Sequence, residues 1–117
     1  MVGGGLGALL DWGLAAHGAT LDGEPKQRAA ARLFELYAAR PTVLSRLYPG
    51  AASALSALRE AGVARGVCTN EPDAIAHDLL QALGVAGAFG CILGGDTRST
   101  NKPDPAGAAR VMAALGA

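Results

Sequence analysis

The sequence predicts an α/β fold in which a helical region precedes a small unit of parallel strands and helices. From Tyr48 onward, helical and strand-like patterns alternate, as is typical of parallel strands joined by right-handed crossovers. Before Pro41 the apolar residues follow helical spacing alone. We therefore divide the chain into residues 1–45, a helical region, and residues 46–117, an α/β region with two parallel strands.

Two helices are expected in the first region. Leucines at helical spacing predict a helix over about residues 5–17 that ends at Gly18. Pro25 suits the first turn of a second helix, over about residues 25–39. The segment 41–50 shows no clear period and predicts an extended linker.

Three helices and two short strands are expected in the second region. Leucines and an isoleucine recur at three- and four-residue spacing, and glycines follow the first two helices as C-terminal stops. Asp104 and Pro105 suit the N-cap and first turn of the last helix. In order, the expected elements are a helix at 50–61, the strand "VARGVC" at 63–68, a helix from Pro72 to Leu83, the strand "GCILG" at 90–94 and a helix at 105–115.

Polar residues follow both strands, at the edge where ligands bind in an open parallel sheet. Thr69 and Asn70 come directly after the first strand, and Lys102 lies in the polar loop 95–103 after the second. Pro72 places Thr69 and Asn70 just ahead of a helix, where N–H groups and the helix dipole favour an anion. A hydroxyl and an amide can donate to a phosphate oxygen, and the lysine adds a positive charge. These residues predict a phosphate-binding corner.

Simpler interpretations of the same residues stay open. Thr69 and Asn70 would also suit a plain helix cap, and Lys102 a solvated loop. Glu71 is unexpected beside a bound dianion, although an acid at a helix N-terminus is favoured by about 0.3–1 kcal/mol. Either its side chain points away from the corner or it lowers phosphate affinity.

Composition narrows the function classes. Ten Lys and Arg residues balance ten Asp and Glu residues, and neither sign forms a block. Nucleic-acid binding is not expected, because it needs a clustered basic face or aromatic stacking platforms. No apolar run reaches the length of a membrane span and the N-terminus lacks a basic start, so we expect a cytoplasmic protein without a membrane partner. Cys68 and Cys91 share no metal-type spacing and are expected to be small buried residues.

Four short motifs in order, "YPG", "CTN", "GGD" and "KPDP", carry a resemblance to a known family. The stretch from Leu47 to Gly116 resembles the middle of a haloacid dehalogenase-like hydrolase, and more narrowly a phosphoglycolate phosphatase, and the residues before it resemble the helical cap. The resemblance implies a partial Rossmann-like core preceded by a partial cap. It also implies Mg²⁺-dependent hydrolysis of 2-phosphoglycolate to glycolate and phosphate. Thr69 and Asn70 would hold the phosphate, and Lys102 would neutralise it and orient the nucleophile, so the implied catalytic residues are Thr69 and Lys102.

The sequence departs from this family at two places. It contains no Asp-x-Asp-Gly-Thr stretch, which carries the family's nucleophile, and Asp96 matches the family's loop aspartate rather than its acidic Mg²⁺ motif. We therefore expect no metal ligands in this chain and no useful phosphatase activity from it alone, because the aspartyl-phosphate route needs both groups. The alternative is a non-catalytic remnant that binds phosphate or a complementing partner chain. Other small phosphate monoesters stay open as substrates.

The resemblance also implies that a further strand belongs beside the strand at 63–68. An apolar strand edge without that neighbour invites pairing with another chain. We therefore expect self-association through the sheet edge.

Overall fold

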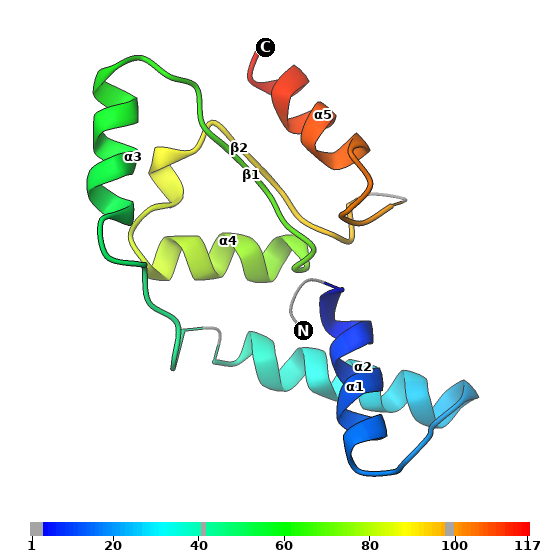
Figure 1. The fold of residues 1–117 in the computed structure, drawn as a ribbon. Coiled ribbons are helices and arrows are strands. Elements are labelled where there is room, and N and C mark those ends of the chain that lie inside the picture. Colours follow the sequence, from blue (N-terminus) through cyan, green and yellow to red (C-terminus); the bar gives the residue numbers. More distant parts are fainter. Residues whose placement is uncertain (1–3, 41, 98–99) are drawn as a thin grey trace. The chain divides into compact units, whose positions relative to one another are not determined.

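The computed structural model describes residues 4–40, 42–97 and 100–117 (Figure 1). Within it, the chain forms two compact units, Met1–Arg40 and Pro41–Ala117. Their assignment as cap and core, with the boundary between residues 45 and 46, stays a prediction.

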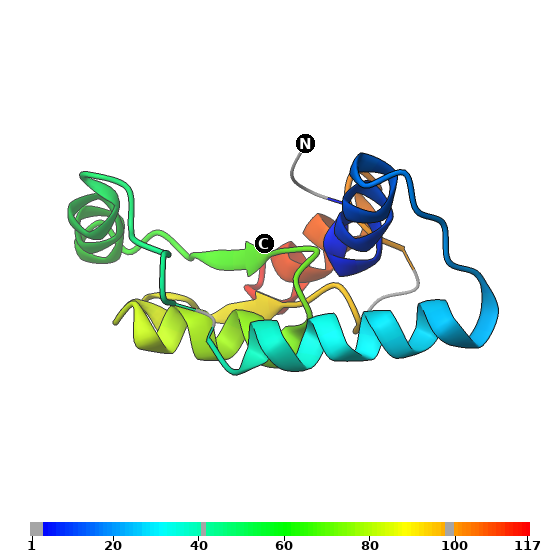
Figure 2. The same cartoon turned by 90° about the horizontal axis from the view of Figure 1, so that it is seen from below.

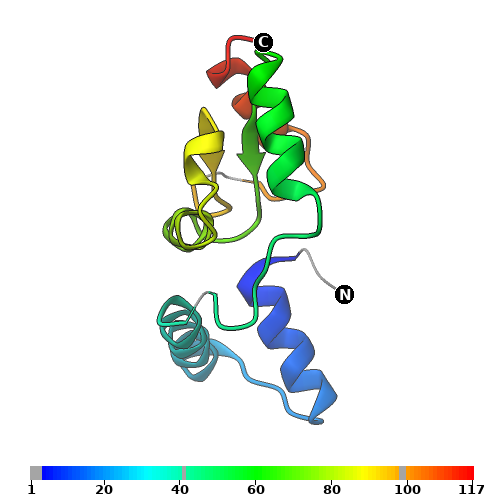
Figure 3. The same ribbon diagram turned by 90° about the vertical axis from the view of Figure 1, so that its left-hand side faces the viewer.

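The first unit is a pair of helices, α1 (Gly5–Ala16) and α2 (Gly23–Ala38), which pack on each other (Figure 3). Lys26 of α2 forms an ion pair with Asp11 of α1, at 2.7 Å between Nζ and Oδ1. Helix α2 begins ahead of the predicted start at Pro25, because the extended backbone of Asp22 already forms its N-cap. Pro25 still lies in the first turn, where its missing N–H costs nothing.

The second unit contains the predicted order of helix, strand, helix, strand and helix. Strands β1 and β2 pair in parallel, with Val67 opposite Ile92, so the predicted α/β class with two parallel strands is confirmed. A 3₁₀ turn, η1, precedes β2 and was not predicted. The elements are α3 (Ala51–Glu60), β1 (Gly66–Cys68), α4 (Asp73–Ala82), η1 (Ala86–Ala88), β2 (Cys91–Leu93) and α5 (Ala106–Ala114).

Both strands are shorter than the sequence predicted. The residues before β1 make other contacts: the Arg65 guanidinium donates to the Val63 carbonyl at 2.6 Å and to the Ala88 carbonyl at 2.7 Å. These bonds tie the entry of β1 to the turn before β2. Regular ladder pairing therefore begins only at Gly66.

The core of the second unit lies between the two strands and the helices that flank them. Helix α5 packs on both strands and α4 packs on β2, and Figure 1 shows the strands running between these helices. A Cβ atom on Gly66 would meet the side chains of Val111 and Leu115, so glycine lets α5 approach β1. The buried apolar residues in the described part of the chain are Ile75, Ala76, Val85 and Val111.

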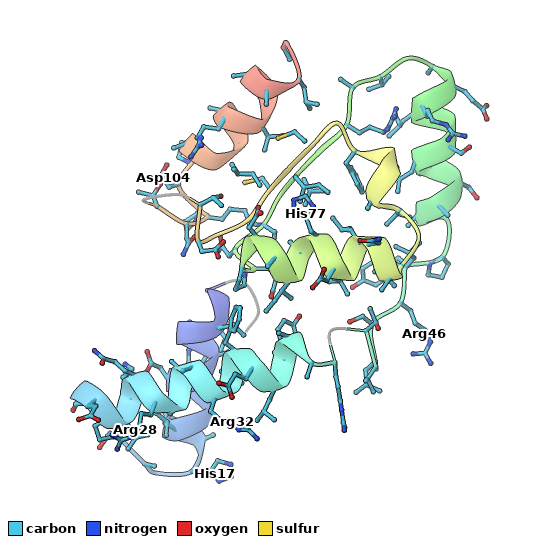
Figure 4. All side chains as sticks on the ribbon, turned by 180° about the vertical axis from the view of Figure 1, so that it is seen from behind. His17, Arg28, Arg32, Arg46, His77 and Asp104 are labelled. Atoms are coloured by element: carbon cyan, nitrogen blue, oxygen red, sulfur yellow. The ribbon has the colours of Figure 1, made fainter. Side chains whose placement is uncertain are left out.

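Two sequence predictions need correction here. Cys68 and Cys91 form no disulfide and are half-buried rather than buried, because the helices cover this narrow sheet only in part. The N-cap position of α5 is Pro105 rather than Asp104. Asp104 still serves the helix start, since its Oδ1 accepts the Ala106 N–H at 2.8 Å (Figure 4).

Among the described residues, no helix combines the length and apolar character needed to cross a membrane.

Candidate phosphate-binding site

Two chain regions meet beyond the carboxyl ends of the strands: residues 69–73 after β1, and residues 94–97 and 100–102 after β2. The arrow of β1 ends at the loop that leads into α4 (Figure 2). The Thr69 N–H donates to the Leu93 carbonyl at 3.0 Å, which extends the ladder one residue beyond β1. The parallel register therefore brings both loops to the same edge of the sheet, as the sequence predicted.

Asn70 joins the two segments directly. Its Oδ1 accepts the backbone N–H of Lys102 at 2.8 Å, and its Nδ2 donates to the Lys102 carbonyl at 3.2 Å. Asn70 is 7% exposed, whereas Lys102 is exposed. The predicted site residues Asn70 and Lys102 are thus neighbours, and their contact runs from a buried amide to the lysine backbone.

Thr69 forms a tight turn at the end of β1. Its hydroxyl oxygen accepts the Glu71 N–H at 3.1 Å. A threonine hydroxyl also carries one hydrogen that it can donate, which is the property that a phosphate oxygen would use. The Glu71 carbonyl accepts the Gly95 N–H at 2.7 Å, and the Glu71 Oε2 atom is buried. This turn fixes the position of the Thr69 hydroxyl oxygen.

The N-terminus of α4 is occupied by a carboxylate from the other segment. Asp96 Oδ1 accepts the Asp73 N–H at 2.7 Å, and Asp73 Oδ1 in turn accepts the Gly94 N–H at 3.0 Å. The sequence suggested that the amides at this helix end serve a bound anion. The Asp73 amide instead serves Asp96, because an acid at a helix N-terminus is favoured by the dipole and satisfies an orphan N–H.

Two consecutive glycines make this close approach sterically possible. A Cβ atom on Gly94 would meet the Asp73 backbone and lie 2.7 Å from the Asp73 Cβ atom. A Cβ atom on Gly95 would lie 2.8 Å from the backbone carbon of Asn70 and would also meet its carbonyl oxygen. Real Cβ atoms do not approach this closely, so the "GG" ahead of Asp96 allows the two loops to touch.

Two further basic side chains lie near the phosphate-binding corner. The Arg110 guanidinium donates to the Thr97 carbonyl at 3.1 Å, which brings a second cation to the loop after β2. His77 of α4 lies with its Nε2 3.7 Å from Asp73 Oδ2 (Figure 4). Arg110 was not predicted as a site residue, because its position on α5 has no motif and only the fold brings it to this loop.

The family follows from comparison with known proteins. A family model of haloacid dehalogenase-like hydrolases matches residues 7–117. The chain belongs to the haloacid dehalogenase-like hydrolase family. A crystal structure of a predicted phosphoglycolate phosphatase from Haemophilus somnus 129PT superposes on 91% of this haloacid dehalogenase-like chain, with a TM-score of 0.76 and 30% identity.

Individual relatives agree with this family membership. Phosphoglycolate phosphatases of Rhodospirillum rubrum and Cereibacter sphaeroides (strain ATCC 17025 / ATH 2.4.3) are each 39% identical to it, over 99% and 97% of the chain. The phosphoglycolate phosphatase of Caulobacter vibrioides is 38% identical over 99% of the chain. The chain spans about half the length of these proteins. The matched share is 50% of the Rhodospirillum protein, 52% of the Cereibacter protein, 49% of the Caulobacter protein and 47% of the Haemophilus structure.

The described residues of this haloacid dehalogenase-like chain do not fit a Mg²⁺ site. Among them, no group of three or more His, Cys, Asp or Glu side chains could hold a metal ion. The two aspartates nearest the corner, Asp73 and Asp96, each accept a backbone N–H. Mg²⁺ prefers an octahedral set of oxygens that includes carboxylates turned toward the ion.

Proposed function

We propose that this chain forms the phosphate-holding part of a phosphoglycolate phosphatase-like hydrolase. The observation that carries the proposal is the pair of bonds between Asn70 and the Lys102 backbone. They bring a lysine from the loop after β2 to the strand end that carries Thr69. The relatives named phosphoglycolate phosphatase support the choice of substrate class.

The proposed roles follow from the chemistry of each side chain. The Lys102 ammonium supplies positive charge to a phosphate dianion, and the Thr69 hydroxyl donates to one of its oxygens. Donors fixed before the reaction stabilise charge that develops on a phosphoryl group. In the whole protein, this charge stabilisation serves the hydrolysis of 2-phosphoglycolate to glycolate and phosphate.

Mg²⁺ dependence of the whole protein is part of the proposal. The ion would supply Lewis-acid stabilisation of the phosphoryl oxygens when bound. The described residues do not fit such a site, so the roles proposed for this chain depend on Thr69 and Lys102 alone. We propose further that the 117-residue chain by itself binds phosphate without turning over a phosphate monoester.

The proposal is tested by phosphate release from 2-phosphoglycolate. The assay compares two samples, the 117-residue chain and the protein as it is expressed from its own gene. Each sample is assayed once with Mg²⁺ and once with EDTA. We expect turnover only from the expressed form with Mg²⁺, and a loss of kcat of about 10²–10³-fold in Lys102→Ala, as for removal of one fixed donor. Thr69→Val should also lower kcat, whereas Thr69→Ser, which keeps the hydroxyl, should retain most of it.

A matched control distinguishes the loss of a positive charge at the proposed site from the loss of a positive charge elsewhere in the chain. Lys26→Ala removes the other lysine of the chain, which pairs with Asp11 in the first unit. It should leave kcat unchanged. Equal activity of Lys102→Ala and the unmodified protein, or no release of phosphate from any small monoester tested, would contradict the proposal.

A further inference from the structure

Asn70 uses both ends of its side-chain amide on the backbone of one residue. Its Oδ1 lies 2.8 Å from the Lys102 nitrogen and its Nδ2 lies 3.2 Å from the Lys102 oxygen. Asn70 is 7% exposed and is the buried polar side chain of the described residues. A phosphate that arrives from solvent would therefore meet the exposed Lys102 rather than this amide.

Only asparagine provides this pair of bonds at this distance. Aspartate has no donor for the Lys102 carbonyl, leucine has neither donor nor acceptor, and glutamine is one methylene longer. Because both the N–H and the C=O of Lys102 are held, its backbone cannot rotate without breaking a bond. A lysine side chain is a flexible four-carbon stem, so fixing its Cα atom limits the region that the ammonium group can reach.

We propose that Asn70 is a positioning residue that acts on a bound phosphate through Lys102 and does not touch the phosphate itself. This inference rests on the proposed function of the corner, and it gives Asn70 a different role from that of Thr69. Misplacing a group that binds or orients a substrate costs up to about 100-fold in rate even when its own chemistry is unchanged.

A double-mutant cycle tests the inference. The dissociation constant of inorganic phosphate is measured by NMR titration for the unmodified 117-residue chain, Asn70→Leu, Lys102→Ala and the double variant. If Asn70 acts through Lys102, Asn70→Leu weakens binding by about tenfold in the unmodified background and has no further effect beside Lys102→Ala. The matched control Asn101→Leu makes the same change at the exposed neighbouring asparagine and should leave affinity unchanged.

Hydrogen exchange of the Lys102 backbone amide provides a second readout, which can already be measured on the unmodified chain. The Lys102 backbone amide should exchange slowly in the unmodified chain, because Asn70 holds it. In Asn70→Leu the same amide should exchange much faster. An unprotected Lys102 amide in the unmodified chain would overturn the inference even if Asn70→Leu does not fold.

The outcomes separate this inference from the proposed function. If the unmodified chain binds phosphate and Asn70→Leu weakens binding equally in both backgrounds, Asn70 touches the phosphate and the positioning role is wrong. If the unmodified chain binds no phosphate, the proposed function of the corner fails and the positioning role falls with it.

Discussion

Gly94 shows how one missing side chain sets the geometry of this corner. The backbone of Asp73 occupies the space that a Cβ atom on Gly94 would need. The same approach lets the Gly94 N–H reach Asp73 Oδ1 at 3.0 Å. A larger residue would have to move a whole backbone segment, because the obstacle is main chain rather than a flexible side chain.

Gly94→Ala should therefore both destabilise the second unit and weaken phosphate binding. Overpacking of this kind typically costs about 1–3 kcal/mol, and here it also pushes apart the loops that carry Thr69 and Lys102. Urea unfolding measures the first effect and a phosphate titration the second. Gly87→Ala is the matched control, since nothing lies within 4 Å of its added Cβ atom. Equal stability of the two variants would show that the loops are not in close contact.

Some of the site could be predicted from single residues and some could not. That Thr69, Asn70 and Lys102 lie near one another could be predicted, because each follows or lies beyond a strand and parallel strands end at one edge; their role in phosphate binding stays a prediction. The bonds among Asp73, Asp96 and Gly94 were missed. They depend on the exact approach of two loops far apart in sequence, which residue types and spacing do not specify.

At the scale of elements, the two loops hold the start of helix α4. Asp96 caps this helix from a loop that lies 23 residues further along the chain than Asp73. A helix cap of this kind replaces the local Ser, Thr or Asp that usually precedes a helix, a place taken here by Pro72. The loop after β2 therefore stabilises the start of α4.

Asp96→Ala should lower the free energy of unfolding by about 0.5–2 kcal/mol, the usual cost of losing an N-cap. The loss leaves the Asp73 N–H without its acceptor and frees the loop after β2. Urea unfolding followed by circular dichroism measures the change. Asp78→Ala on the exposed side of α4 is the control and should change stability by less than about 0.5 kcal/mol. A larger effect from Asp78→Ala would refute the capping role.

The helix pair of the first unit offers a prediction about pH. The side-chain hydrogen bond and the charge of Asp11 raise the pKa of Lys26 above its usual value of 10.5. A raised pKa means that this ion pair stabilises the folded unit at pH values below 10.5, and that the contribution is lost as the pH rises through the raised value.

The pH effect is measured by comparing Lys26→Met with the unmodified chain. Thermal melts of helix content should show the unmodified chain to be more stable at pH 7, with the difference closing as the pH rises through the raised pKa of Lys26. The effect should be small, since the pair lies at the surface. A stability difference that persists unchanged after Lys26 has lost its proton would mean that Lys26 stabilises the helices by packing rather than by charge.

Element boundaries were predicted less well than element order. Apolar periodicity, glycine stops and prolines near helix starts located the α-helices of the described residues, because these signals are local, but they did not reveal the 3₁₀ turn η1. The strands were predicted too long, since Arg65 uses its guanidinium to hold the carbonyls before β1 and β2 in other bonds. No periodicity reveals such a contact.

On the scale of the whole molecule, the sheet of the described residues has two strands and hence two edges. A two-stranded sheet is marginally stable, and an unpaired strand edge is a template for another chain. Val63, just before β1, and Met112 on α5 are among the exposed apolar residues. These features support the proposal that the chain self-associates.

Self-association should appear as a concentration-dependent mass in analytical ultracentrifugation of the 117-residue chain. We expect a broad thermal transition whose midpoint rises with protein concentration, because association stabilises the folded form. Val63→Lys places a charge beside the entry of β1 and should reduce association, whereas Gly87→Ala should not. A strict monomer with a sharp, cooperative melt would contradict this expectation.

The proposed function requires that Lys102 binds a phosphate at the strand ends. Because the chain contains only two lysines, Lys26 and Lys102, their side-chain NMR signals can be followed separately. On titration with inorganic phosphate, we expect a saturable shift of the Lys102 side-chain signal, whereas the Lys26 signal should stay unchanged. The Lys102 shift should be lost in Thr69→Val. Equal shifts of both lysines, or no shift of Lys102 at saturating phosphate, would contradict the proposed function.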